Sequence, residues 1–165
     1  MENKKCIMRK GKYNMFIPEI PDNSITDRIK TIIELGEEMV DRYGDKALEL
    51  EYPILDDEIE VWEKEHDIVI PDSYKEWLHF SKKSTIRGII ATFYEPKEFV
   101  IDNDKKAFDV PDDCVVIGEL GGWGVSVCFY KENGEIMYVD HGEECRHLDF
   151  GDILDWVIED MEELV

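Results

Sequence analysis

The chain has 165 residues, and its 40 acidic and 19 basic residues give it a net charge of -21 at pH 7. This charge repels DNA, RNA and anionic lipid, and it favours a partner with a basic surface that electrostatic attraction steers towards the protein. An acidic exterior can also do no more than keep a protein soluble. The charge by itself therefore does not decide between a basic partner and solubility. A chain of this length can bury a self-sufficient core without a disulfide or a metal.

No part of the sequence reads as a membrane span or a secretion signal. Membrane helices need roughly 18 consecutive apolar residues, and no run approaches that length. Residues 1–12 carry five basic residues and one acidic residue, and no apolar signal core follows them. We therefore expect a cytoplasmic protein with a flexible N-terminal arm. Its four cysteines lack CxxC spacing and are expected to be reduced thiols: Cys6, Cys114, Cys128 and Cys145.

One amphipathic helix is predicted near the N-terminus. Residues 13–20 are apolar enough to form an edge strand, which Pro18 and Pro21 end. A helical stripe over residues 24–44 stops at a glycine and consists of Ile25, Ile29, Ile32, Ile33, Val40 and Tyr43. Residues 45–53 are expected to be a connection. We treat residues 1–51 as an N-terminal extension.

A second helix is predicted over residues 56–67. Asp57 and Glu60 have the spacing of a capping box, which marks a helix start. Its inward stripe has four members at helical spacing: Leu55, Ile59, Trp62 and His66. The β-branched run 68–70 and Pro71 then end this helix.

A third, shorter helix is predicted directly after Pro71. Ser73 and Glu76 repeat the spacing of a capping box. The inward residues again recur at helical spacing: Tyr74, Trp77, Leu78 and Ser81. Large aromatic side chains on this face predict that the helix packs against a core.

Beyond Ser84 the hydrophobic pattern takes the two-residue period of β-strands. Short β-branched or aromatic runs predict strands over residues 89–94, 98–101 and 114–117. The clearest hairpin signal follows, since residues 125–131 alternate, Asn133-Gly134 fits a type I′ turn, and residues 135–139 return. Val125, Val127 and Phe129 are predicted to share one face of the hairpin, and Ser126, Cys128 and Tyr130 the other.

A last helix is predicted behind a cap at Asp149. Its inward residues are Phe150, Leu154, Val157 and Met161. The chain therefore reads as helices, then an antiparallel meander, then one helix that covers the sheet. This order is typical of an α+β fold.

Three motifs occur together in the second part of the chain. They are Glu58-Ile59 with Glu63 and the run Ile70-Pro71-Asp72-Ser73-Tyr74-Lys75-Glu76-Trp77-Leu78; Ile117-Gly118 with Gly121-Gly122-Trp123-Gly124; and Phe150-Gly151-Asp152-Ile153-Leu154. They resemble the opening, the loop before the central hairpin and the closing helix of the SUKH superfamily, also called the SMI/KNR-type domain. The resemblance covers residues 52–164, and we assign residues 52–165 to a SUKH-like domain. One departure is that HFSKKST stands at residues 79–85, where the family often has an Asn-Gly-Gly turn.

The resemblance implies a protein-binding domain without catalysis, metal or cofactor. Bacterial members are widely immunity proteins that neutralise a cognate toxin, frequently a nuclease, whereas fungal members regulate cell-wall synthesis through protein contacts. The charge of -21 fits the first role, because a polyanion can mimic the nucleic acid that a basic cleft binds. We expect an immunity protein for a basic toxin, with an intracellular adaptor of the same fold as the alternative. The sequence does not specify the oligomeric state.

A small metal-dependent hydrolase is the third reading. His141, Cys145 and His147 could hold a zinc ion with an open position, but their spacing is loose and no fourth ligand is marked. A solvated loop between a strand and the last helix explains these residues more simply. A nucleophile pair of Cys128 or Cys145 with His141 is weaker still, because nothing marks a lowered thiol pKa.

Carboxylates are too numerous in this chain for any single pair to indicate chemistry. We expect a partner to contact acidic side chains near the C-terminus together with tryptophans that lie off the core stripes. The candidates for a partner-binding surface are Trp123, Glu143, Glu144, Asp152, Asp155, Trp156 and Glu159. For Trp123, in a glycine-rich loop, a buried position is an equal alternative.

Overall fold

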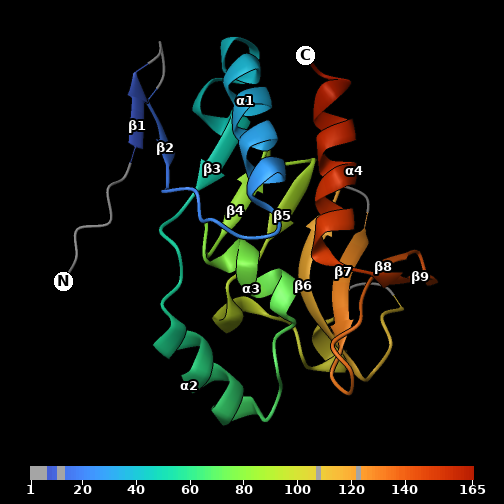
Figure 1. The fold of residues 1–165 in the computed structure, drawn as a ribbon. Helices are drawn as coiled ribbons and strands as arrows, with labels where there is room; N and C mark the ends of the chain where they lie inside the picture. Colours follow the sequence, from blue (N-terminus) through green and yellow to red (C-terminus); the bar gives the residue numbers. More distant parts are fainter. Residues whose placement is uncertain (1–6, 11–13, 107–108, 122–123) are drawn as a thin grey trace.

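A computed structural model of the chain has an antiparallel sheet of seven strands at its centre (Figure 1). It describes residues 7–10, 14–106, 109–121 and 124–165. The strands lie in sequence order: β3 (Leu48–Leu50), β4 (Ser84–Ile86), β5 (Ala91–Phe93), β6 (Cys114–Leu120), β7 (Val125–Tyr130), β8 (Ile136–Asp140) and β9 (Glu143–Leu148). Helices α1 (Thr26–Tyr43), α3 (Asp72–Leu78) and α4 (Phe150–Glu162) pack on one face, and α2 (Asp56–His66) lies at one end. The predicted α+β fold is confirmed.

Helix α1 packs beside α4, although the two are far apart in sequence (Figure 1). It ends at Gly44, whose φ of 65° lies in the region that favours glycine, as the sequence predicts. Its buried residues, among them Ile29, Ile32 and Met39, belong to the same core as those of α3 and α4. Residues of the N-terminal extension thus help to form the core of the whole chain.

Four strands were not expected, β1 (Ile7–Lys10), β3, β4 and β9. Strand β1 pairs with Asn14–Ile17 (β2), so the prediction of a flexible arm is wrong for these residues. Residues 48–50 form β3 within the predicted connection. Residues 143–148 form β9 in place of the predicted loop. Strands of three to six residues are too short to set a clear period, so pairing with a neighbour decides their structure.

Helices α2 and α3 occur where the sequence predicts them, but neither predicted capping box forms. In α2 the Glu58 carboxylate accepts a hydrogen bond from the Leu55 amide at 3.0 Å, so the cap lies two residues before the predicted one. Leu55 is exposed, and His66 stacks on the Trp62 ring with centroids 4.4 Å apart. Of the predicted stripe only Ile59 and Trp62 are buried.

In α3 the residues of the predicted capping box instead bond to distant parts of the chain. Ser73 Oγ accepts a hydrogen bond from the amide of Phe150 at 3.2 Å, and the Glu76 carboxylate accepts one from the Ser24 hydroxyl. The inward stripe of Tyr74, Trp77, Leu78 and Ser81 is buried as predicted. Ser73 and Glu76 therefore bond to tertiary partners, and the N-cap of α3 is Pro71, two residues before the predicted cap.

The central hairpin has the predicted faces but a different turn. Val127 and Phe129 lie in the core under the helices, whereas Cys128 and Tyr130 lie in a smaller core on the opposite face with Val110. Of Asn133 and Gly134 only Gly134 has a positive φ, and residues 131–134 form a longer loop in which the Gly134 amide donates to Tyr130 O at 2.8 Å. The type I′ prediction at Asn133-Gly134 is therefore wrong.

A two-residue turn of the expected kind connects β8 to β9 instead. His141 and Gly142 both have positive φ values, 49° and 86°, and Asp140 pairs with Glu143. A further correction concerns residues 98–101, predicted as a strand. Only Val100 makes an isolated bridge, to Val116, and Pro96–Glu98 form a turn of 3₁₀ helix.

The centre of the sheet is anchored to α3 by the hydroxyl of Tyr74. This buried hydroxyl donates to the carbonyl of Tyr94 at 2.6 Å, and the carbonyl of Ile117 lies 3.3 Å away, beside an irregularity in the pairing of β6 with β7. At Gly118 an added Cβ would lie 2.5 Å from the Thr92 carbonyl oxygen, so the close approach of β5 and β6 requires glycine there.

Helix α4 forms as predicted and covers the sheet. The Asp149 carboxylate accepts from the Asp152 amide at 3.0 Å, and the Asp152 carboxylate accepts from the Asp149 amide at 3.0 Å. All four predicted inward residues are buried: Phe150, Leu154, Val157 and Met161.

Candidate partner-binding surface

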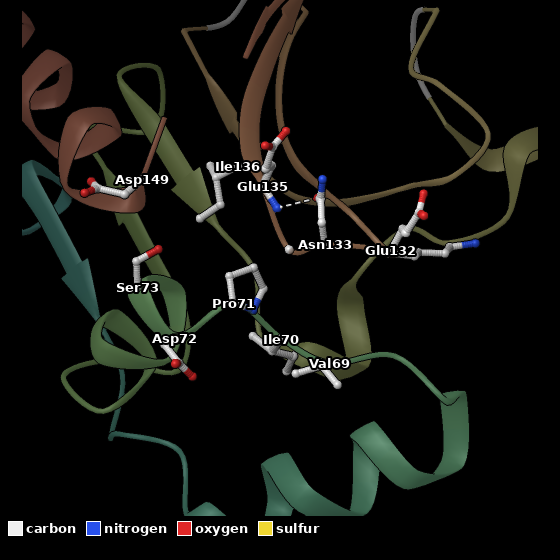
Figure 2. Close-up of a pocket in the computed structure, with 12 residues that line it drawn as sticks. Val69, Ile70, Pro71, Asp72, Ser73, Glu132, Asn133, Glu135, Ile136 and Asp149 are labelled. Carbon is white, nitrogen blue, oxygen red and sulfur yellow. Dashed lines mark hydrogen bonds between the residues drawn. The ribbon is translucent and has the colours of Figure 1, made fainter. Parts of the chain in front are cut away.

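The first groove of interest lies between the α2–α3 connection, the β7–β8 hairpin and the start of α4 (Figure 2). We call it the Pro71 groove, and its volume is about 440 Å³. It is lined by Val69, Ile70, Pro71, Asp72, Ser73, Lys131, Glu132, Asn133, Gly134, Glu135, Ile136 and Asp149. The motif that resembles the SUKH opening therefore forms one of its walls.

Local backbone chemistry fixes the walls of the Pro71 groove. Gly134, with φ of 72°, brings the hairpin tip towards the Pro71 ring, and an added Cβ there would lie 3.8 Å from Pro71 Cγ. Asn133 Oδ1 accepts from the Glu135 amide at 2.9 Å, the bond drawn in Figure 2. The start of α4 forms the third wall, and the hydrogen bond from the Phe150 amide to Ser73 Oγ connects it to α3.

The Pro71 groove is acidic and has an apolar margin. Four carboxylates and one lysine are among its lining residues: Asp72, Glu132, Glu135, Asp149 and Lys131. Val69 at its margin is 65% exposed, whereas the neighbouring Ile70 is fully buried. A basic, extended segment with one apolar side chain would match this combination of charge and exposed surface.

A second groove, of about 320 Å³, lies between α4 and the β6–β8 part of the sheet. We call it the Trp156 groove. Its lining residues are Leu120, Gly121, Val125, Tyr138, Trp156, Glu159 and Asp160. The rings of Tyr138 and Trp156 meet edge to face, with centroids 4.6 Å apart and planes at 81°. This is a favourable aromatic contact, and both rings keep part of their surface exposed.

The electrostatic environment of the Trp156 groove is anionic. The pKa of Asp160 is raised, first by partial burial and then by the Glu163 carboxylate. Burial, the neighbouring Cys145 thiol and the carboxylates of Asp140 and Glu143 raise the pKa of the Tyr138 hydroxyl. Burial is the larger cause of both pKa shifts, and neighbouring negative charge adds to it.

Among the sequence candidates that the structure describes, two lie together in this groove, Trp156 and Glu159. Glu143 and Glu144 are exposed on β9, where the Tyr130 hydroxyl donates to Glu144 at 3.4 Å. Asp152 belongs to the cap of α4. The guanidinium of Arg28 donates two hydrogen bonds to Asp155, at 2.8 and 3.0 Å. Trp123 lies outside the described residues.

Sequence reasoning missed Tyr138, Asp160 and the whole Pro71 groove. Asp160 could have been found from its spacing, because residues three and four positions after Trp156 lie beside it on a helix. Tyr138 could not, since its contact with Trp156 depends on how α4 crosses β8. The Pro71 groove joins three segments that are distant in sequence.

Of the proposed zinc ligands, the structure describes the side chains of His141 and Cys145. His141 Nδ1 lies 2.6 Å from Asp140 Oδ1 at the exposed β8–β9 turn, and Cys145 lies on β9 opposite Tyr138. The side chain of His147 is not among those the structure describes. Over the described part of the chain, no three His, Cys, Asp or Glu side chains are arranged to hold a metal ion.

The cysteines of the described residues are free thiols: Cys114, Cys128 and Cys145. The first two are fully buried in the smaller core. The hydrogen bond that the Cys128 thiol donates to Cys114, followed by burial, raises the pKa of Cys128, which opposes formation of a nucleophilic thiolate.

The family comparison agrees with the fold and with the motifs that form these walls. The model of the SMI1 / KNR4 family (SUKH-1) matches residues 53–163, about two-thirds of the chain. The chain belongs to this family. A search of the curated proteins finds no match for this SUKH-1 protein. Within the described residues, its helices are too short or too polar to cross a membrane.

Proposed function

We propose that this SUKH-1 protein is a bacterial immunity protein that binds a basic protein toxin, such as a nuclease, and blocks its active surface without catalysis or a cofactor. The observation that carries the proposal is the acidic lining of two grooves on a protein of charge -21. Nuclease clefts bind phosphate through basic side chains, so an acidic surface can occupy them in place of the nucleic acid. Family membership supports a protein-binding role.

A hydrolase has less support from the site geometry. Of the carboxylates of the Pro71 groove, Asp149 caps α4, and Asp72 and Glu132 are exposed. The buried thiols lie on the opposite face of the sheet, in the smaller core. Hydrolysis by a nucleophile requires that the nucleophile and a base lie close together. Binding a partner does not require this.

The test is co-expression with the protein encoded next to this chain in its genome. If that neighbour is toxic, we expect this chain to restore growth and to form a complex with its toxin domain. A toxic neighbour whose effect this chain leaves unchanged, with no complex in solution, would contradict the proposal. A harmless neighbour, together with tight binding of a host protein, would favour an intracellular adaptor.

A further inference from the structure

The Trp156 groove combines an aromatic floor with carboxylates at its margin. The Trp156 and Tyr138 rings form a corner with planes at 81°, and Leu120 and Val125 continue the apolar surface across the ends of β6 and β7. Glu159 and Asp160 lie one turn further along α4 than Trp156 and are exposed. An apolar groove alone would not define a ligand. Here the carboxylates favour a positively charged ligand, and the aromatic rings favour a planar one.

Neither carboxylate has a basic partner among the described residues. The ion pair of α4 that the structure describes joins Asp155 to Arg28, one turn before Glu159. The Glu163 carboxylate, after partial burial, raises the pKa of Asp160 and adds negative charge beside it. A cation that entered the groove would therefore relieve repulsion that the folded protein leaves in place.

We propose that the Trp156 groove receives an arginine side chain of the protein partner. The guanidinium stacks on the exposed part of the Trp156 ring while its N–H groups donate to the Glu159 and Asp160 carboxylates. A planar guanidinium is suited to this site because it stacks on aromatic rings, loses water more readily than an ammonium group and binds carboxylates through two N–H groups. The inference rests on the proposed function and names the partner chemistry at one of its surfaces.

The inference can be tested without the partner by using a short peptide as the probe. Acetyl-Gly-Arg-Gly-amide is titrated against the full chain at constant ionic strength, and the indole N–H signal of Trp156 is followed by NMR. Trp156→Phe assigns that signal. The same peptide with citrulline in place of arginine has nearly the same shape but no charge. We expect the arginine peptide to bind at least about five-fold more tightly than the citrulline peptide.

Two charge-matched variants separate a local effect from a general one. Glu159→Gln with Asp160→Asn removes the groove carboxylates and is expected to abolish the preference for arginine. Glu60→Gln with Glu65→Gln removes the same charge from exposed positions on α2 and is expected to change the affinity less than about two-fold. Equal binding of the arginine and citrulline peptides, or equal losses in both double variants, would overturn the inference.

The outcome is distinguishable from failure of the proposed function. If the groove shows no preference for arginine but the chain still rescues growth, the inference fails and the immunity role stands. If the groove selects arginine but the chain neither rescues growth nor binds the neighbouring toxin, the groove chemistry stands and the immunity role fails.

Discussion

Two aromatic clusters of the same geometry differ in their environment. In the interior, the Phe150 ring meets Tyr74 at 4.8 Å and Phe93 at 4.9 Å, with planes at 78° and 77°, and all three side chains are fully buried. At the surface, Tyr138 and Trp156 meet at 4.6 Å and 81° but remain partly exposed. One helix, α4, supplies a member of each cluster. Its first turn completes the core, and a later turn presents an aromatic face that a partner can cover.

This difference separates stability from recognition. An aromatic ring that is fully buried has already contributed its hydrophobic free energy to folding, whereas a partly exposed ring retains surface for binding. The charges follow the same division, since Asp155 is bound by Arg28 and Glu159 and Asp160 have no described basic partner. We therefore expect substitutions in the interior cluster to change folding and those in the Trp156 groove to change binding.

The largest effect is expected from Phe150→Ala. Removing a buried aromatic ring should lower the free energy of unfolding by about 3–5 kcal/mol, because apolar contacts are lost and a cavity remains. Trp156→Ala should cost only about 1–2 kcal/mol, because part of that ring is already in water. Urea denaturation measures both variants. Equal losses would show that the two clusters do not differ in their contribution to stability.

The hydroxyl of Tyr74 provides the next largest effect. Tyr74→Phe leaves the carbonyl of Tyr94 without its donor in the core, so we expect a loss of about 1–3 kcal/mol in the free energy of unfolding. Tyr94→Phe is the matched control, because that hydroxyl bonds to Glu119, which is exposed. Its loss should be clearly smaller. A control variant as unstable as Tyr74→Phe would contradict this account.

The Arg28–Asp155 pair should have a smaller effect. It is bidentate but only partly buried, and it joins the N-terminal extension to α4. A double-mutant cycle with Arg28→Gln and Asp155→Asn should give a coupling energy of about 0.5–1 kcal/mol that decreases as salt is added. The cycle is measured by urea denaturation at low and high salt. A coupling energy of zero would contradict the conclusion that Asp155 stabilises the fold through its ion pair with Arg28.

The smallest expected effect is a pH-dependent one at Asp160. The raised pKa means that the folded state disfavours the ionised carboxylate, so this group lowers stability above its folded pKa and has no effect below its unfolded pKa. Asp160→Asn should raise the melting temperature slightly at pH 7, with a gain below about 0.5 kcal/mol, and the gain should vanish near pH 3. Thermal unfolding of both proteins at the two pH values measures it. If Asp160→Asn were less stable than the unchanged protein at pH 7, the conclusion that the Asp160 charge is uncompensated would be wrong.

Sequence reasoning located the elements whose pattern is long and regular. The eighteen residues of α1 and the buried stripes of α3 and α4 follow from helical spacing alone. The cap of α2 is local but lies at Leu55, whose amide donates to Glu58. The cap of α3 does not follow from spacing, because Ser73 and Glu76 are taken by Phe150 and Ser24, which only the fold brings near. The same holds for the partner-binding surface. Trp156 and Glu159 share a helix face, but Tyr138 joins them through packing of α4 on the sheet.

The most direct test of the central claim, that the acidic exterior binds a basic protein, is calorimetry of this chain with the protein encoded beside it, the proposed toxin. Measurements at about 50 and about 500 mM NaCl cover the range in which charge attraction is progressively screened. We predict a one-to-one complex whose dissociation constant rises at least about ten-fold over this range. Absence of binding at the lower salt concentration, or an affinity that salt does not change, would contradict it.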